Sequence, residues 1–349
     1  MARESRPGQT RQEGNSLTII RCSDICEMTG MQVGEFFTNY LQGGVKRKNG
    51  VRELLKLKDW PPDGDMRDFA PRHTADFYEM CPVPEYTNPK GPFNIVSLFP
   101  QNLSQPDLGP KCYIAFGSPD EAPCEGKNGF EDRGDSVTKM HYDMADAVNL
   151  LVHVQSDAMV KAQEEGERDF SNLPCQHDEV GAVWDLFHRN DAAKLELWIK
   201  EKAAEGRWYH GPNKVVLTAT QNETDAAMPD ESVLDHPIHD QLVYLRKDDL
   251  ALLKQETGIV PWRIYQREGD AVFVPSRCSH QVRNLRPCVK IAVDFVSVEN
   301  AQFAVDLADD YRGLKQGHTH KEDVLQARAV AMHAWAAAEA LATGGAGAR

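Results

Sequence analysis

From Phe93 onwards, short apolar runs alternate along the chain with clusters of Gly, Pro and Asp. The runs are NIVSLF, KCYIAFG, AVNLLVHV, NKVVLTAT, QLVYL, AVFVP and VKIAVDFV. Many short strands with turns between them are typical of an all-β sandwich or barrel, and they argue against alternating βαβ units. The pattern therefore predicts a mainly β core over residues 93–300.

Helical periodicity marks segments on both sides of this core and one segment inside it. Residues 181–201, GAVWDLFHRNDAAKLELWIKE, carry apolar side chains largely on one stripe, which predicts a helical insertion. Residues 17–92 have a mixed pattern that includes a helix in MQVGEFFTNYLQGG, and residues 301–341 predict further helices. Residues 1–16 and 342–349 are polar or Gly-rich, and we expect both ends to be disordered.

Composition and charge limit the classes of function. The 349 residues include 53 acidic and 39 basic side chains, so the formal net charge is −14, and 41% of the residues are apolar. This composition is that of a soluble globular protein with a sizeable core. The negative charge argues against a nucleic-acid surface across the chain, and it suits a basic partner. The sequence has no apolar run long enough to span a membrane and no secretory signal at its start.

The eight cysteines are scattered, and none forms a C-x-x-C pair. Structural zinc sites require ligands at short spacing, so we expect no structural zinc here. Scattered cysteines without a secretory signal favour a reducing compartment, either the cytosol or the nucleus.

Two separated motifs carry the candidate chemistry. The first is GDSVTKMHYD, which ends in His141 and Asp143, and the second is GDAVFVPSRCSH, which ends at His280 and is followed by Asn284. Two imidazoles and one carboxylate form the facial triad of non-haem Fe(II) oxygenases, which leaves coordination positions open. Residues i and i+2 of a strand point the same way, so His141 and Asp143 would converge on one ion. The alternative makes His141 a core histidine and Asp143 a turn residue.

Strand parity extends the predicted site. Asn149 and His153 share parity with the first motif, so an unbroken strand would aim them into the same cavity, although His153 could also be a core residue. In VKIAVDFV, the apolar face is formed by Ile291, Val293 and Phe295. Lys290 lies on the other face, where a buried ammonium is costly unless it meets an anion such as the carboxylate of a 2-oxo acid. The alternative is a solvent-exposed Lys290 on an edge strand.

Three further residues are weaker candidates. His236 and His239 could form a second metal pair in HPIHDQ, but Pro237 and the lack of a third nearby ligand favour a structural role. Tyr113 in KCYIAFG could hydrogen-bond a bound ligand, or it could have a local partner in the core.

The segments HYDMADAVNLLVHV, HPIHDQLVYL, GDAVFVPSRCSHQVRN and VKIAVDFVSVEN resemble the JmjC-domain histone demethylases, in particular the subgroup that acts on mono- and dimethylated histone H3 lysine 9. Upstream, LLKLKDWPP, APRHTADFYEMCPVPEY and PDLGPKCYIAFG resemble the plant-type members of that subgroup. The resemblance runs from about residue 50 to residue 330. Two departures are Arg277 and Ser279, where relatives often carry Gly and Pro.

The resemblance implies a double-stranded β-helix, that is, a cupin-like jelly-roll with helical flanks. It implies Fe(II) bound by His141, Asp143 and His280, with 2-oxoglutarate and dioxygen as cosubstrates. It also implies that Thr138, Asn149 and Lys290 contact 2-oxoglutarate, and Tyr113 is a further candidate for this cofactor site.

The activity implied by the resemblance is oxidative removal of methyl groups from a lysine of histone H3, with release of formaldehyde and succinate. Its partners would be the histone H3 tail and chromatin in the nucleus, and the basic tail suits the net charge of −14. Two alternatives remain open. One is a JmjC hydroxylase of proteins or small molecules, because the triad does not specify which C–H bond is oxidised. The other is a catalytically silent chromatin scaffold, against which the intact triad argues.

Overall fold

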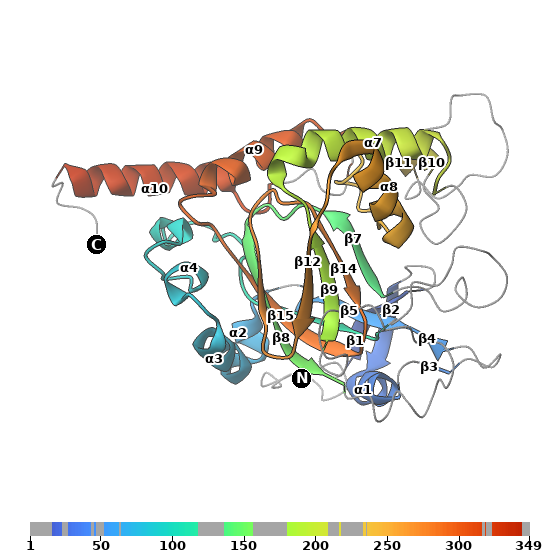
Figure 1. Cartoon of the computed structure of the whole chain (residues 1–349). Coiled ribbons are helices and arrows are strands. Elements are labelled where there is room, and N and C mark those ends of the chain that lie inside the picture. The colour runs from blue at the N-terminus through green and yellow to red at the C-terminus, as the bar shows by residue number, and fades with distance from the viewer. Residues whose placement is uncertain are drawn as a thin grey trace.

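The computed structural model describes residues 16–22, 27–42, 45–46, 52–62, 64–117, 136–155, 180–208, 216–217, 233–234, 236–315, 318 and 323–343. The disorder predicted for residues 1–16 and 342–349 falls mostly outside these ranges, although Ser16 begins a strand and Ala342 ends a helix. The described part confirms the predicted jelly-roll with helical flanks, because two antiparallel sheets form its centre (Figure 1).

The two main sheets contain seven and four strands, in the orders β13-β8-β15-β6-β5-β1-β2 and β12-β9-β14-β7. Their bounds are β1 Ser16–Arg21, β2 Glu27–Gln32, β5 Leu55–Trp60, β6 Lys111–Ala115, β7 Val137–His141, β8 Asp146–Val154, β9 Val180–Leu186, β12 Trp262–Arg267, β13 Ala271–Val274, β14 His280–Asn284 and β15 Cys288–Phe295. Two short pairs join β3 Val45–Lys46 to β4 Arg52–Glu53, and β10 Val216–Leu217 to β11 Val233–Leu234.

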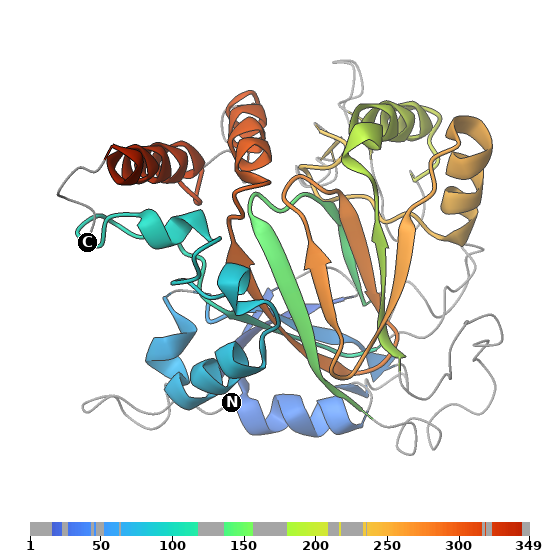
Figure 2. The same cartoon turned by 60° about the vertical axis from the view of Figure 1, so that its left-hand side comes forward.

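Helices cover both ends of the sheets (Figures 1 and 2). They are α1 Val33–Leu41, α2 Met66–Phe69, α3 Pro71–Met80, α4 Pro84–Thr87, α7 Ala192–Ala204, α8 Lys247–Thr257, α9 Ala301–Arg312 and α10 Ala327–Ala342, with 3-10 turns η2 Ile95–Leu98 and η4 Arg189–Asp191. Helix α1 lies at one end, and α7, α8 and α9 lie at the other, while α10 projects away from the body (Figure 1). Among the described helices, none is long and apolar enough to cross a lipid bilayer.

The alternation in β15 determines which side chains face the interior of the jelly-roll. As predicted, Ile291, Val293 and Phe295 pack outward, in one hydrophobic cluster with Phe36 of α1 and Phe77 of α3. The intervening residues of the same strand must then point between the two sheets, because successive side chains of a strand alternate between faces. Strand β15 therefore places Lys290 inside the jelly-roll, while its apolar residues pack against the helices outside.

The predicted helix over residues 181–201 is wrong in its first part. Val180–Leu186 is strand β9, which pairs with β12 and β14, and all seven of its residues are buried. A central strand that is covered on both faces has a continuous apolar run without period-two alternation, and such a run resembles a buried helix. The helix of this segment, α7, begins only at Ala192.

The N-terminal segment takes part in the main sheet. Strands β1, β2 and β5 lie within residues 17–92, except for Ser16, and they extend the seven-stranded sheet beyond β6. Strands from both sides of residue 93 therefore belong to one sheet. The boundary between an N-terminal segment and a β core at this residue stays a prediction from the sequence pattern.

Candidate metal centre

The structure brings His141, Asp143 and His280 together at the end of the four-stranded sheet. The Nε2 atom of His141 lies 3.5 Å from Oδ1 of Asp143, and Nε2 of His280 lies 3.5 Å from Oδ2 of the same carboxylate. The centroids of the two imidazole rings are 4.1 Å apart. Within the described ranges, this is the one group of three or more His, Cys, Asp or Glu residues whose potential ligand atoms all lie within 4.8 Å of one another.

Each imidazole is oriented by a backbone carbonyl two residues earlier. Nδ1 of His141 is 2.8 Å from the carbonyl oxygen of Lys139, and Nδ1 of His280 is 3.0 Å from that of Cys278. A carbonyl can only accept, so each Nδ1 donates and each Nε2 keeps its lone pair for a metal. Burial, together with the neighbouring His280, lowers the pKa of His141, so this ring is neutral at physiological pH.

A β-bulge places Thr138 and His141 on the same face of β7. His280 pairs with His141 and Val282 pairs with Thr138, so the one residue between them on β14 lies opposite two residues of β7. Directly paired residues share a face, and His280 and Val282 are two apart and therefore point the same way. Without the extra residue, Thr138 and His141 would point to opposite faces, so the bulge brings both into the interior.

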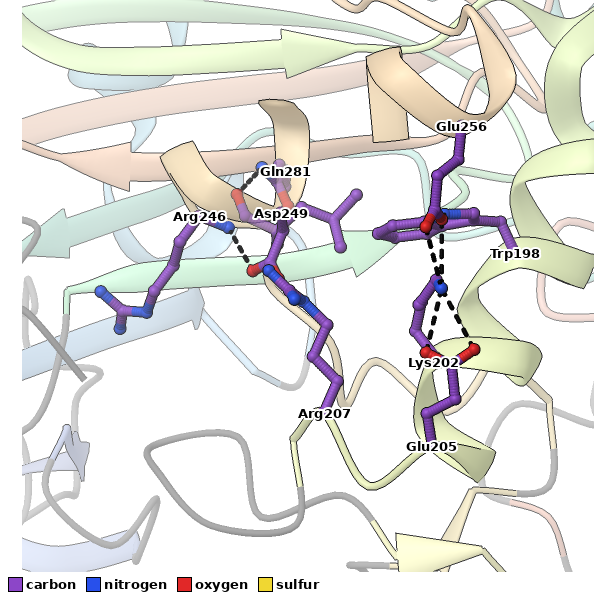
Figure 3. A network of polar contacts seen from close by, with 9 residues as sticks. Trp198, Lys202, Glu205, Arg207, Arg246, Asp249, Glu256 and Gln281 are labelled. Atoms are coloured by element: carbon purple, nitrogen blue, oxygen red, sulfur yellow. Dashed lines mark hydrogen bonds and ion pairs between the residues drawn. The ribbon is translucent and has the colours of Figure 1, made fainter. Parts of the chain in front are cut away.

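The strand that carries His280 is fixed from its outer side by Gln281 (Figure 3). The Gln281 amide accepts from the backbone N–H of Leu245 and donates to its carbonyl, both at 2.7 Å, and it also donates to Asp185 at 3.0 Å. Leu245 precedes Arg246, the N-cap of α8, and the Asp249 carboxylate accepts from the backbone N–H of Arg246 at 2.9 Å. The start of α8 is therefore attached to β14.

Helix α8 is in turn joined to α7 by a polar cluster (Figure 3). Lys202 of α7 lies between Glu205, at 2.9 Å, and Glu256 of α8, at 3.1 Å. Glu256 also accepts from the indole N–H of Trp198 at 2.7 Å. Helices α7 and α8 are thus joined to each other and, through Leu245 and Gln281, to strand β14 that carries His280.

The donor set fits a divalent iron ion. Two imidazole nitrogens and one carboxylate lie on one side of a common centre, which is the arrangement found in non-haem Fe(II) oxygenases. The side chain of Asp143 is 31% exposed, so the centre can be reached from solvent, whereas His280 is almost completely buried. The core-histidine alternative for His141 gives no reason for both Nε2 atoms to converge on one carboxylate.

Lys290 is buried and faces the interior, as the alternation of β15 predicts. The strand lies between β8 and β6, so the alternative of an exposed edge strand is wrong. The ammonium donates to Oδ1 of Asn284 at 2.5 Å and lies 5.5 Å from the ring centroid of Trp184. Burial, with the nearby cation of Lys56, lowers the pKa of Lys290. The Asn284 amide and the Trp184 ring carry no negative charge, so neither neutralises the Lys290 ammonium, and an anion would be a favourable further partner.

Tyr113 is directly opposite Lys290 in the register of β6 and β15, so both side chains share the interior face. Burial, followed by the carboxylates of Asp59 and Asp294, raises the pKa of Tyr113 well above its usual value. Its hydroxyl is therefore protonated at physiological pH, and its hydrogen bond with Asp59 gives it a local partner, which is the alternative that the sequence left open.

Asn149 reaches the interior by a different route from the predicted one. Strand β7 ends at His141, and β8 begins at Asp146 in the other sheet, so the assumption of one unbroken strand is wrong. Asn149 is buried opposite Ala292. His153 lies outside the cavity, with 48% of its side chain exposed and Nδ1 3.8 Å from a Glu268 oxygen.

The pair His236 and His239 has the structural role favoured by its sequence. Their rings are 4.0 Å apart, and Nδ1 of His236 accepts from the backbone N–H of His239 at 3.1 Å. The other nitrogen of His236 lies 3.9 Å from a Glu196 oxygen. An Nδ1 atom that already accepts from the backbone is not available as a metal ligand.

Sequence reasoning missed Trp184, Lys56 and Lys139. The ring of Trp184 is stacked on His280 at 6.0 Å, but its segment was interpreted as helix. Burial, with the nearby Lys56, lowers the pKa of Lys139 to about 8. The signal available in the sequence was a lysine two residues before His141 on the same strand, because a partly buried ammonium has to be compensated.

Comparison with known proteins agrees with this geometry. Residues 182–295 match the family described as "JmjC domain, hydroxylase". "Lysine-specific demethylase JMJ29" of Arabidopsis thaliana is 37% identical over 350 aligned positions, covering 90% of this chain and 36% of that protein. "Lysine-specific demethylase JMJ26" of the same plant is 37% identical, with 92% and 36% covered. "Lysine-specific demethylase 3A" of Homo sapiens is 33% identical, with 94% and 24% covered.

A jelly-roll that holds two histidines and one carboxylate around a common centre defines the class of cupin-type metal-binding proteins. The chain spans about a third of the length of the two plant relatives. Within that class, the chain contains a JmjC domain, and it is similar along most of its length to proteins named as lysine-specific demethylases.

Proposed function

We propose that this protein catalyses Fe(II)- and 2-oxoglutarate-dependent demethylation of lysine in histone H3, with mono- or dimethylated lysine 9 as the substrate. The observation that carries the proposal is the convergence of both imidazole Nε2 atoms on the Asp143 carboxylate. The names of the relatives support lysine demethylation as the reaction. With 2-oxoglutarate and dioxygen, the bound iron would supply the oxidation that converts an N-methyl group into formaldehyde.

The proposed ligands are His141, Asp143 and His280, with the two rings held in place by their backbone acceptors. For 2-oxoglutarate, we propose Lys290 as the partner of a carboxylate, since it is the buried ammonium of the interior face. Tyr113 lies beside it with a protonated hydroxyl.

Thr138 and Asn149 complete the proposed cosubstrate site. Thr138 faces the interior beside His141 because of the bulge in β7. Asn149 enters from the opposite sheet. Groups on both sheets would therefore orient the cosubstrate between them and exclude water from the centre.

The proposed partner is the histone H3 tail in chromatin, and the proposed location is the nucleus. A net charge of −14 favours the encounter with a strongly basic peptide, and it does not favour direct contact with nucleic acid. The relatives named as lysine-specific demethylases support a substrate of this kind.

A second candidate is hydroxylation of a protein or small molecule, because the matching family description includes the word hydroxylase. The two reactions share the metal centre and differ in the product. Demethylation removes a carbon from the substrate, whereas hydroxylation adds oxygen.

Mass spectrometry of histone H3 peptides separates these possibilities. Peptides with mono-, di- or trimethylated lysine 9 are incubated with the protein, Fe(II), ascorbate and 2-oxoglutarate, and an Asp143→Ala variant serves as the control. We expect a loss of about one methylene mass per turnover with the wild type and no change with the variant. A gain of one oxygen mass would support hydroxylation. Unchanged peptides with the metal-loaded wild type would support a silent scaffold and overturn the proposal.

A further inference from the structure

The turn that leads into β14 contains a residue in an unfavourable backbone conformation. Arg277 has a φ of 60°, in the left-handed region. The N–H of Cys278 donates to the carbonyl of Pro275 at 3.0 Å, so Arg277 is the third residue of a β-turn. Glycine is the residue that adopts this conformation without steric cost, because it has no Cβ. An arginine at this position therefore requires compensation elsewhere.

The backbone of this turn supports both halves of the metal centre. The N–H of Arg277 donates to the carbonyl of Asp143 at 3.1 Å. The next carbonyl, that of Cys278, accepts from Nδ1 of His280. Rotation of the turn would therefore displace two of the three proposed ligands together.

The side chain of Arg277 extends from the turn to helix α9. Its Nη2 lies 2.6 Å from Oδ2 of Asp310, and its Nη1 lies 3.6 Å from Oδ2 of Asp306. The two aspartates are four residues apart and share one face of the helix. The last turn of α9 is thus joined by two ion pairs to the turn that precedes β14.

We propose that Arg277 is a positioning residue, whose ion pairs with Asp306 and Asp310 hold the turn in the left-handed conformation that supports Asp143 and His280. The proposal rests on the metal site proposed above. Glycine would adopt the same φ but would leave the turn free to adopt others, whereas arginine attaches it to a helix. Ion pairs whose side chains are 33–44% exposed contribute little to global stability, so the effect is expected in the geometry of the site.

The test measures the affinity for Mn(II), used alone as a redox-stable substitute for Fe(II), together with the midpoint of thermal unfolding without metal. The variants are Arg277→Gly, Asp310→Asn, their combination and Arg277→Lys. We expect each of the first two to weaken Mn(II) binding roughly tenfold, with a change in the midpoint of only about 2 °C. The combination is expected to be no weaker than Arg277→Gly alone, because both changes remove the same contact. Lysine keeps a charge and should restore part of the affinity.

Arg328→Ala is the matched control, because it removes an ion pair of similar exposure from the same helix. Arg328 of α10 lies 2.6 Å from Oδ2 of Asp309 on α9, and this ion pair joins the two helices rather than the turn. This variant should bind Mn(II) as the wild type does. A purely structural role for Arg277 would lower the unfolding midpoint and leave the Mn(II) affinity unchanged.

The outcomes distinguish this inference from the proposed function. If the wild type binds Mn(II) and all variants bind it equally, the positioning role is wrong and the metal site stands. If neither Mn(II) nor Fe(II) binds to the wild type, both proposals fail. Should Arg277→Gly fail to fold, Asp306→Asn combined with Asp310→Asn removes both acceptors without changing the turn, and wild-type affinity in that variant would equally overturn the inference.

Discussion

The rings of His141 and His280 are each oriented by a backbone carbonyl only two residues earlier in the chain. The acceptors of the rings, the carbonyls of Lys139 and Cys278, belong to the same strand or turn as the histidines that they orient. The centre is therefore preorganised by its own strands, and a metal does not have to turn the rings. This explains why the H-x-D spacing and the distal His280 were recognisable in the sequence, since local backbone carries most of the geometry.

Replacing Asp143 with alanine should abolish metal binding without unfolding the protein. The carboxylate is the group on which both Nε2 atoms converge, so we expect at least about a 100-fold loss of Mn(II) affinity. The side chain is part-exposed, so the unfolding midpoint of the metal-free protein should change little. Isothermal titration and thermal unfolding measure the two quantities. Asp309→Ala, on the surface of α9, is the control, and retained affinity in Asp143→Ala would refute the ligand assignment.

Replacing Lys290 with alanine should raise the apparent KM for 2-oxoglutarate. Removing one member of a buried charge pair costs about 2–5 kcal/mol, which is roughly 30- to several-thousand-fold in affinity. Metal affinity should fall much less, because the ligands remain. Arginine should restore only part of the effect, since its planar group is wider than an ammonium. Lys200→Ala, on the exposed side of α7, serves as the control, and an unchanged KM in Lys290→Ala would place the anchor elsewhere.

At the scale of elements, a single carboxylate joins three segments of the jelly-roll. Asp146, at the start of β8, accepts from the backbone N–H of Ser276 at 2.8 Å and from the Asn300 amide at 2.6 Å. It also accepts from the backbone N–H and the hydroxyl of Ser297, at 2.9 and 2.6 Å. The turn before β14, the end of β15 and the start of α9 are thus fixed to β8.

Asp146→Ala should therefore be strongly destabilising. It leaves several buried donors without an acceptor, and we expect a loss of about 3–5 kcal/mol in the free energy of unfolding. Urea denaturation followed by circular dichroism measures this loss. Glu299→Ala removes a nearby exposed carboxylate that accepts one bond from Tyr86, and it should cost less than about 1 kcal/mol. Equal stabilities of the two variants would contradict the role given to Asp146.

The chain just after β6 passes very close to the backbone at Arg286, and this approach requires a glycine at position 117. A Cβ on Gly117 would lie 2.2 Å from the Cα of Arg286, so the two backbones approach as closely as only glycine allows. Gly117→Ala should lower the free energy of unfolding by about 2 kcal/mol or more. Gly34→Ala in α1 has open space around the added methyl and should be neutral or stabilising, by up to about 1 kcal/mol. Similar unfolding midpoints for the two variants would refute this close contact.

Elements differ in how clearly their sequence predicts them. The faces of β15 were predictable, because large apolar side chains at Ile291, Val293 and Phe295 alternate with charged or small residues, which defines a strand that is covered on one side by helices. Strand β9 was not predictable, because all of its residues are buried and alternation disappears. The bulge in β7 was not predictable either, since the extra residue between Thr138 and His141 is visible only against the partner strand.

At the scale of the whole molecule, strand order was beyond local reasoning. Strand β8 lies between β13 and β15, and β7 pairs with β14, so the neighbours come from distant parts of the chain. Periodicity reports which face of a strand is buried and contains no information on its partner. The fold class was recognisable from the many short strands and from the family resemblance.

Removal of residues 1–60 should prevent the rest from folding stably, although the composition places a boundary at 93. The deletion removes β1, β2 and β5, which leaves the edge of β6 unpaired, and it removes α1 from the hydrophobic cluster that covers β15. We expect no cooperative thermal unfolding transition for residues 61–349, as measured by calorimetry. A soluble fragment with a sharp transition near that of the intact chain would show that residues 61–349 fold without β1, β2 and β5.

The pairing of β7 with β14 also determines the order in which the centre is completed during synthesis. His141 and Asp143 leave the ribosome roughly 140 residues before His280, which corresponds to on the order of 10–30 s at usual rates of translation. During that interval β7 lacks its partner strand, and β8 lacks both of its neighbours. The nascent chain therefore carries exposed strand edges and an incomplete set of proposed ligands until β14 has been made. The proposed metal site can be completed only after His280 has been synthesised.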